Sequence, residues 1–236
     1  MTQILMSDQA SAQQELFTQA WALTTLDQIQ GAERGALILF LARLELFPSL
    51  SLATAQLQQA DLRQINLQNT DLQQVDLSQA DLRFADLTQA NLAQAVLVDA
   101  NLTGAELAGA TLTLAYAQGS NFSGVNASEA DLTEADLSLA NLYGSYFPYA
   151  NLAQSFLESA NLRRSNFQGA NLEGASLKGS DLRQTDLREA TLIGANLSDT
   201  NIEGTFWAGA IYDQTTIFPA GFIPEEWGLI PVEESD

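Results

Sequence analysis

Residues 80–104 read ADLRF ADLTQ ANLAQ AVLVD ANLTG, five blocks in which a small residue comes first and leucine third. The same register runs from Ala55 to Gly209 without insertion or deletion, which makes 31 consecutive pentads. The third residue is large and apolar in 29 of them, the exceptions being Ala117 and Ala127. A period of five fits neither a helix, with about 3.6 residues per turn, nor a strand, with a side-chain period of 2. A repeat of this kind predicts a solenoid of short strands and tight turns.

The pattern also predicts which way each side chain points. The first and third residues lie two apart on a short strand, so both face the interior, while the second and fourth face solvent. The first residue is always Ala, Ser, Thr, Val or Ile, and the second is usually Asp or Asn. We therefore expect a narrow core of alternating small and large side chains.

The fifth residue is expected to form a corner. All 11 glycines of the repeat region occupy the fifth position: Gly104, Gly109, Gly119, Gly124, Gly144, Gly169, Gly174, Gly179, Gly194, Gly204 and Gly209. A type II turn needs a positive φ at one central residue, which glycine supplies without steric cost. Before Gly104 the same position holds Gln, Asn, Phe or Asp, so we expect a different turn geometry in the first two coils.

The A-(D/N)-L-x-x pattern resembles that of the pentapeptide-repeat family and covers 155 of the 236 residues. The resemblance implies an all-β solenoid, a right-handed quadrilateral β-helix with four pentads per coil and about eight coils. The closing segment, with Tyr212 and the run TIFPAGFIP at 216–224, resembles that of cyanobacterial members. The resemblance therefore also implies a cyanobacterial origin.

The two ends of the repeat are expected to be covered, because open strand edges invite aggregation. Residues 1–50 predict a short α-helical cap, with one helix through 10–28, capped by Ser7 or Ser11, and a second from about Ala32 to Phe47, ended by Pro48. This segment is either only a cap or also a docking module. Residues 51–210 form the repeat domain, and 211–236 form an irregular aromatic cap with an acidic tail.

Composition excludes several kinds of chemistry. The chain has no His and no Cys, so neither a Ser-His-Asp triad nor a cysteine nucleophile is possible. The aspartates of successive pentads point away from one another, so they predict no metal site and no acid/base pair. We expect no enzyme, no catalytic residue and no cofactor.

The charge and the hydropathy limit the partners and the location. The net charge of −20 argues against direct binding to nucleic acid or to an anionic membrane. The apolar stretch 35–47 is shorter than the roughly 20 residues that span a bilayer, and the start shows no secretory signal pattern. A cytoplasmic protein is expected, monomeric or weakly dimeric end to end.

A column of arginines is one candidate surface. Residues 20 apart stack on one another, which places Arg63, Arg83, Arg163 and Arg183 in one column beside a column of Asp and Asn. This is either a ladder of ion pairs or an anion- or partner-binding stripe.

Three groups of exposed apolar residues are further candidates. They are either scattered residues with no role or sites that bind a protein. The first is Tyr143, Tyr146 and Tyr149, with Pro148, expected around one corner. The second is Leu114, at a corner, with Tyr116 just beyond it. The third lies along one face and is interrupted by Asp136; it consists of Val96, Tyr116 and Phe156.

One part of the core departs from the leucine pattern. Ala117 and Ala127 lie on opposite sides of one coil, with Phe122 between them. Phe122 either fills the space that the missing leucines leave, or the coil encloses a ligand cavity.

Two functions follow from these observations. The first is a non-catalytic scaffold that presents a rigid acidic solenoid to a protein partner. The alternative, which the resemblance implies because some family members bind DNA gyrase, is an acidic mimic of duplex DNA. The column of arginines argues against this alternative.

Overall fold

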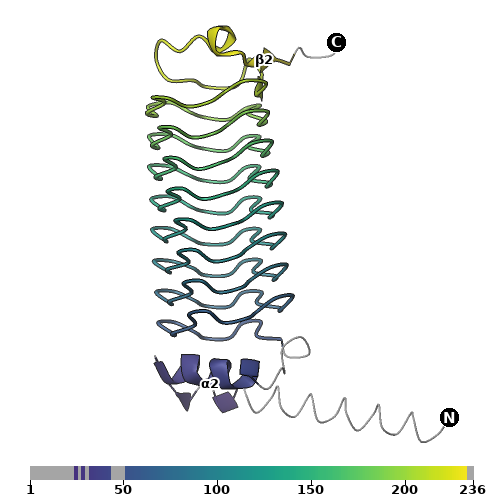
Figure 1. The fold of residues 1–236 in the computed structure, drawn as a ribbon, viewed down its shortest axis with the longest axis vertical. Coiled ribbons are helices and arrows are strands. Elements are labelled where there is room, and N and C mark those ends of the chain that lie inside the picture. The colour runs from purple at the N-terminus through teal and green to yellow at the C-terminus, as the bar shows by residue number, and fades with distance from the viewer. Residues whose placement is uncertain (1–23, 26–27, 30–31, 44–50, 233–236) are drawn as a thin grey trace, which may run out of the picture.

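The repeat region folds as a stack of four-sided coils (Figure 1). The computed structural model describes residues 24–25, 28–29, 32–43 and 51–232. Parallel bridges join each second-position residue to the residue 20 positions further on, from Gln56 with Asp76 to Thr191 with Ile211. Because 20 residues are four pentads, each coil has four sides.

We call these sides faces A to D. Face A contains the pentads that begin at residue 60 and at every twentieth residue up to 200. Faces B and C follow it along the chain and begin at residues 65 and 70. Face D contains the pentads that begin at residue 55 and at every twentieth residue up to 195, and it closes each circuit.

The core confirms the expected direction of the side chains. First-position and third-position residues are buried along the repeat, as Ala80 and Leu82 show at 1% and 0% exposure; Ile202, in the last face A pentad, is only partly buried. Ala117, Ala127 and Phe122 are all buried in this continuous core. One coil beyond Ala127, in the same column, Phe147 stacks on Phe167 with ring centroids 5.0 Å apart. The structure thus places a second large ring next to a missing leucine, which favours packing compensation over a ligand cavity.

The prevalence of Asp and Asn at the second position has a structural cause. In pentads that have a coil on both sides, the N–H groups of residues one, two, three and five donate to main-chain carbonyls, either across the turn or to a neighbouring coil. The N–H of the fourth residue instead donates to Oδ1 of the second residue, as Thr88 does to Asp86 at 3.1 Å. All 21 Asp and Asn residues at this position in the repeat accept that bond. Each side chain therefore satisfies a donor that the main chain leaves over.

The corner geometry corrects one expectation. Fifth-position residues before Gly104 have a positive φ, for example 59° at Gln59 and 59° at Phe84, close to the 67° of Gly104. The same turn hydrogen bond forms at both kinds of corner, for example from Ala60 to Leu57 at 3.1 Å and from Ala105 to Leu102 at 2.9 Å. The prediction of a different turn in the first two coils was wrong, because the stacked coils fix the corner whichever residue occupies it. Polar residues such as Gln accept this strained conformation at a cost of about 1–2 kcal/mol.

Helix α2 (Ala32–Arg43) lies across the N-terminal end of the solenoid (Figure 1). Its Gly35, Ile38 and Leu41 are buried, and Arg34 Nη1 donates to Gln58 Oε1 of the first coil at 2.6 Å. The helix was expected to continue to Phe47, but residues 44–50 lie outside the described part of the chain, as does most of the first expected helix.

The C-terminal end departs from the repeat after one inserted residue, since Asn196 pairs with Ile217 rather than with residue 216. Strand β1 (Ile211–Tyr212) pairs in parallel with β2 (Ile230–Pro231), and the 3-10 helix η1 (Pro224–Trp227) lies between them in sequence. The aromatic rings of this segment pack on one another and on the last coil through Trp207–Phe222, Tyr212–Phe218, Phe218–Phe222 and Phe222–Trp227. The acidic tail, 233–236, lies outside the described residues.

Two kinds of feature are absent from the described residues. No helix among them is long and apolar enough to cross a membrane. No group of three or more Asp, Glu, His or Cys side chains among them is placed to hold a metal ion.

Candidate functional site

Apolar residues at the second position mark the surfaces where the chain departs from its own structural rule. Every second-position residue of face A is Asp or Asn. Large apolar residues replace them at five positions on the other faces: Val96, Tyr116, Tyr146, Phe156 and Phe206. A side chain of this kind cannot accept the fourth-residue N–H, so the pentad loses that hydrogen bond. These five positions are therefore candidates for binding surfaces.

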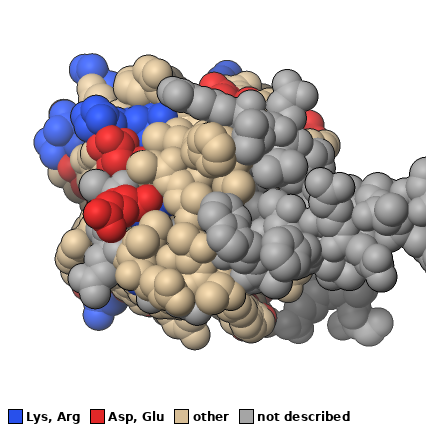
Figure 2. Space-filling model, turned by 90° about the horizontal axis from the view of Figure 1, so that it is seen from below, with Lys and Arg blue, Asp and Glu red and all other residues tan. Residues whose placement is uncertain are grey.

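The charge of the repeat is divided unequally among the faces. Between residues 55 and 209, face A carries five basic and four acidic residues. Face B carries one basic and five acidic residues, face C no basic and four acidic residues, and face D one basic and five acidic residues. Seen from the α2 end, the Lys and Arg side chains gather mainly along one edge of the molecule (Figure 2). Three of the four faces are therefore acidic and one is nearly neutral.

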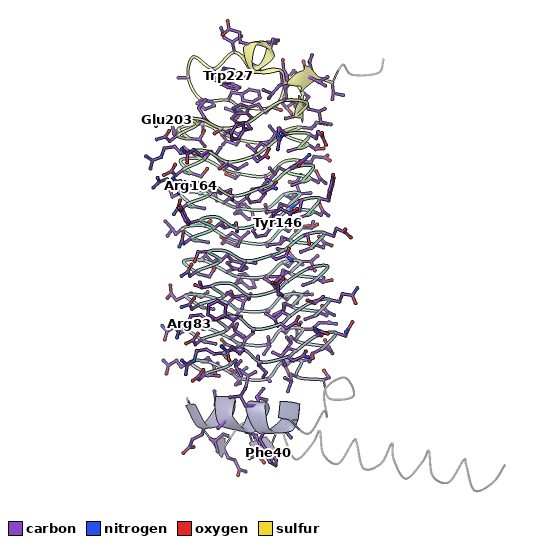
Figure 3. The ribbon with its side chains drawn as sticks, in the orientation of Figure 1. Phe40, Arg83, Tyr146, Arg164, Glu203 and Trp227 are labelled. Carbon is purple, nitrogen blue, oxygen red and sulfur yellow. The ribbon has the colours of Figure 1, made fainter. Side chains whose placement is uncertain are left out.

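The tyrosine patch, which we define as Tyr143, Tyr146 and Tyr149, spans face B and its two corners. Tyr143 is the last residue before the corner at Gly144, Tyr146 follows that corner, and Tyr149 forms the next corner with a φ of 57°. The three side chains are 37%, 48% and 63% exposed. The expectation of a single shared corner was wrong for Tyr149. Tyr146 and Arg164 are labelled in Figure 3.

Two of these tyrosines also make contacts within the fold. Arg164 Nη1, from the next coil, donates to the hydroxyl oxygen of Tyr143 at 3.0 Å. The ring of Tyr149 lies over Gly169, where an added Cβ would come within 2.5 Å of it. Among the described residues, no side-chain hydrogen bond and no glycine contact of this kind involves Tyr146.

Pro148 explains how Tyr146 is accommodated. Pro148 was expected to be exposed with the tyrosines, but it is buried. It occupies the fourth position, whose N–H would donate to the second residue in other pentads. Proline has no N–H, so Tyr146 leaves no donor unsatisfied.

The second candidate surface is a groove, with a volume of about 450 Å³, along the corner between faces C and D. One wall carries Leu114, Glu134 and Gln154, and the other carries Tyr116, Asp136 and Phe156. Tyr116, Asp136 and Phe156 lie on three successive, directly bridged strands. The structure therefore brings Leu114 and Tyr116 together with Phe156, around the acid that interrupts the column. Val96 does not line this groove.

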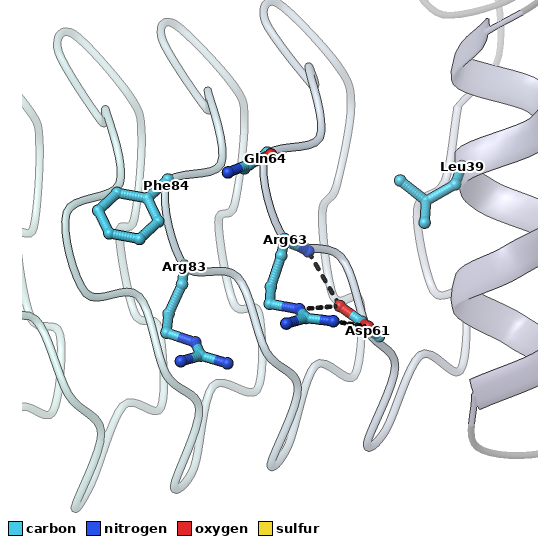
Figure 4. A pocket seen from close by; sticks show the side chains of 6 residues that line it. All are labelled: Leu39, Asp61, Arg63, Gln64, Arg83 and Phe84. Atoms are coloured by element: carbon cyan, nitrogen blue, oxygen red, sulfur yellow. Dashed lines mark hydrogen bonds and ion pairs between the residues drawn. The ribbon is translucent and has the colours of Figure 1, made fainter.

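The arginine column on face A forms ion pairs. Arg63, Arg83 and Arg183 each contact the Asp two residues earlier, at 2.6, 2.7 and 2.6 Å. Arg163 follows Asn161 instead, and its Nε lies 3.9 Å from Asp181 of the next coil. Figure 4 shows Arg63 beside Asp61 and one coil from Arg83. These three residues, together with Leu39 of α2, line a pocket at the N-terminal end of face A. This geometry favours the ladder of ion pairs, because the carboxylates neutralise most of the column.

Sequence reasoning missed part of the exposed apolar surface. Phe84 and Leu139 are 61% and 68% exposed at corners, and neither was among the predicted surface residues. Phe84 lies over Gly104 of the next coil as Tyr149 lies over Gly169. Their signal in the sequence was a large apolar residue at a fifth position.

The ion pairs make the stability of the folded state depend on pH. Hydrogen bonds from Arg83, Arg183 and Arg188 hold the pKa values of Asp81, Asp181 and Asp186 below the ordinary value of 3.8. A carboxyl with a lower pKa in the folded state than in the unfolded state stabilises the fold above its unfolded pKa. This contribution is lost as the pH falls below about 4 and through the folded pKa.

We therefore expect the variant D81N/D181N/D186N to lose less stability than the wild type between pH 6 and pH 3. Asparagine keeps the oxygen that accepts the fourth-residue N–H and removes the titrating charge. The measurement is the urea midpoint at several pH values. The control D71N/D131N/D136N removes the same charge from positions without an arginine partner. Equal pH dependence in the two variants would contradict the prediction.

The family of the chain follows from its repeats. Eight copies of the pentapeptide-repeat family model match within residues 55–206, in overlapping segments 55–94, 80–116, 112–147, 140–179 and 170–206. The chain belongs to the pentapeptide-repeat family. Its members fold as right-handed quadrilateral β-helices and are generally structural or interaction proteins.

Solved structures similar to the chain include two from the cyanobacterium Nostoc. The pentapeptide-repeat protein alr5209 is 36% identical, covering 43% of this chain and 84% of its own, with a TM-score of 0.43. HetL, described as involved in the regulation of heterocyst differentiation, is 34% identical over 68% of this chain and 81% of its own, with a TM-score of 0.28.

A third similar structure is QnrB1, described as a plasmid-mediated fluoroquinolone resistance protein. It is 20% identical over 68% of this chain and 83% of its own, with a TM-score of 0.41. Among curated proteins, no match to the chain is found.

Proposed function

We propose that the protein is a non-catalytic scaffold that binds a partner protein through side chains displayed on its rigid, acidic coils. The observation that carries this proposal is the replacement of Asp or Asn by an aromatic residue at second positions such as Tyr116, Tyr146 and Phe156. In 21 other pentads this position serves the fold. Aromatic side chains on a rigid surface are favourable contacts for a protein partner, because they bury a large area at a low cost in conformational entropy.

The division of charge supports a protein partner over the alternative, a DNA mimic that binds gyrase. Duplex DNA is negative on all sides, whereas face A carries one more basic than acidic residue. The exposed aromatic second positions lie on two of the acidic faces, B and D. We place this scaffold in the cytoplasm, as a monomer or a weak end-to-end dimer.

The tyrosine patch is the first surface to test. We expect the variant Y143S/Y146S/Y149S to lose a partner that the wild type captures from a native-cell lysate, because three exposed rings would be removed from one coil. Quantitative mass spectrometry of the captured proteins is the measurement. Far-UV circular dichroism should be unchanged, since none of the three side chains is in the core.

A matched control distinguishes a specific binding site from nonspecific hydrophobic association. L139S removes an apolar side chain that is 68% exposed at another corner, and it should leave capture unchanged. Capture that survives the triple substitution would refute the patch as the site. Equal losses with L139S would show that exposed apolar area alone is responsible.

A further inference from the structure

The groove between faces C and D combines aromatic rings with carboxylates. Tyr116 and Phe156 are 53% and 47% exposed, and Asp136 lies on the strand between theirs. Strands in a sheet are about 4.8 Å apart, so the two rings are attached about 9.6 Å apart, on either side of the carboxylate. Glu134 of the other wall belongs to the same coil as Asp136.

Asp136 is held in place by the fold. Its Oδ1 accepts the N–H of Ser138 at 3.0 Å, as second-position residues do elsewhere, and its Oδ2 accepts a hydrogen bond from Gln118 Nε2. The carboxylate is therefore fixed in orientation. Among the described residues that line the groove, none is Lys or Arg. The carboxylate of Asp136 therefore has no basic neighbour among them.

The two rings occupy their positions at a cost to the fold. Tyr116 and Phe156 stand where Asp or Asn would accept the N–H of Gln118 and of Glu158. Unlike Tyr146, neither is followed by a proline that removes this donor. Their occurrence in the column of Asp136 is therefore best explained by what they bind.

We propose that this groove binds an arginine side chain in a basic segment of the partner protein. The inference rests on the proposed function and names the chemistry of the partner at this surface. A guanidinium is planar, stacks on aromatic faces and pairs with carboxylates. Tyr116 and Phe156 supply the faces, Asp136 and Glu134 supply the charge, and Leu114 contacts the aliphatic part of the side chain.

The test uses two synthetic peptides and the full chain. The probe is acetyl-Gly-Arg-Gly-Arg-Gly-amide, and its matched control has citrulline, which is uncharged, in place of both arginines. We expect the arginine peptide to bind in a calorimetric titration and the citrulline peptide to bind about tenfold or more weakly. Equal binding of the two peptides would overturn the proposal.

Two pairs of variants assign the binding to the groove. D136N keeps the oxygen that accepts the Ser138 N–H but removes the charge, and we expect it to weaken arginine-peptide binding about tenfold or more. D131N makes the same change at a second position of face C and should leave binding within about twofold. Because the two variants have the same net charge, equal effects would mean that only general attraction to an acidic protein is measured, and would overturn the proposal.

Y116N/F156N removes the rings and restores an acceptor for each fourth-residue N–H. We expect peptide binding to be lost while the thermal midpoint stays the same or rises, which rules out unfolding as the cause. Retained binding would show that the peptide does not bind in the groove, and would overturn the proposal. If the wild type captures a partner from the lysate and Y116N/F156N captures it equally, the inference fails while the proposed function stands. If the wild type captures no specific partner, the proposed function itself fails.

Discussion

Replacing Phe147 by alanine should lower the free energy of unfolding by about 3–5 kcal/mol, the usual cost of removing a buried aromatic side chain. Phe147 is fully buried, and its ring is parallel to that of Phe167 within 2°. Its neighbour on the other side in the same column is Ala127, where most pentads have leucine. The variant would place two alanines in successive coils, and the cavity could not close because the coils are tied together by backbone hydrogen bonds.

The measurement is urea unfolding, with hydrogen exchange to locate the loss of stability. In a solenoid each coil contacts only its neighbours, so protection should fall first in the coils that contain residues 127, 147 and 167. L82A is a matched control, because it truncates a fully buried side chain in a column that keeps leucine, Leu62 and Leu102, in the coils on both sides. A loss below about 1 kcal/mol for Phe147→Ala would show that the column is loosely packed.

A double-mutant cycle tests whether Phe147 compensates for Ala127. F147L alone leaves space beside the alanine, and A127L alone crowds the phenylalanine. The double variant F147L/A127L restores the usual leucines, so it should be more stable than the sum of the single effects predicts, by about 1–3 kcal/mol. Additive effects would mean that the two residues do not share the same space.

The pentad register made the solenoid and its core predictable from the sequence. A buried Leu82 and a corner at Gly104 follow from side-chain alternation and from the conformational freedom of glycine. The positive φ of the fifth-position residues Gln59 and Phe84 could not be predicted, because stacking between coils imposes it rather than the residues' own preference. Local propensity predicts a turn less well when long-range pairing determines it.

The sequence was enough to name the exposed residues of the candidate sites, but not to show how these residues come together on the surface. Tyr116 and Phe156 were recognised as exposed, yet the role of the second-position oxygen was not, since it depends on which main-chain donor remains unpaired in the coil. The groove with Leu114 required the corner between faces C and D to be placed in space. The burial of Pro148 likewise had no signal in the periodicity.

Replacing Gly35 of α2 by alanine should destabilise the protein by about 1–3 kcal/mol, the cost of overpacking a close contact. Helix propensity alone predicts the opposite sign, since alanine is favoured over glycine in a helix by about 1 kcal/mol. A Cβ at Gly35 would lie 2.5 Å from the carbonyl oxygen and 2.8 Å from the nitrogen of Asp61, and these backbone atoms cannot move aside.

The position of this contact explains its importance. In the next coil the corresponding backbone atoms of Asp81 pair with the first coil: its N–H donates to Ala60 at 2.9 Å, and its carbonyl accepts from Leu62 at 2.8 Å. In the described part of the chain no coil precedes Asp61, and Gly35 lies against this open edge instead. A helix displaced by the added methyl group would leave the edge exposed to exchange with solvent and to pairing with other chains.

The sign of the change in stability therefore decides between a tight cap and a loosely associated helix. Calorimetric thermal unfolding gives that sign, and hydrogen exchange should show lost protection in residues 56–64. The control is A36G at the next, exposed position, which lowers helix propensity by about 1 kcal/mol and adds no atom near Asp61. If Gly35→Ala raised the thermal midpoint, α2 would not cover the first coil closely, and the first coil would need another partner for its open edge.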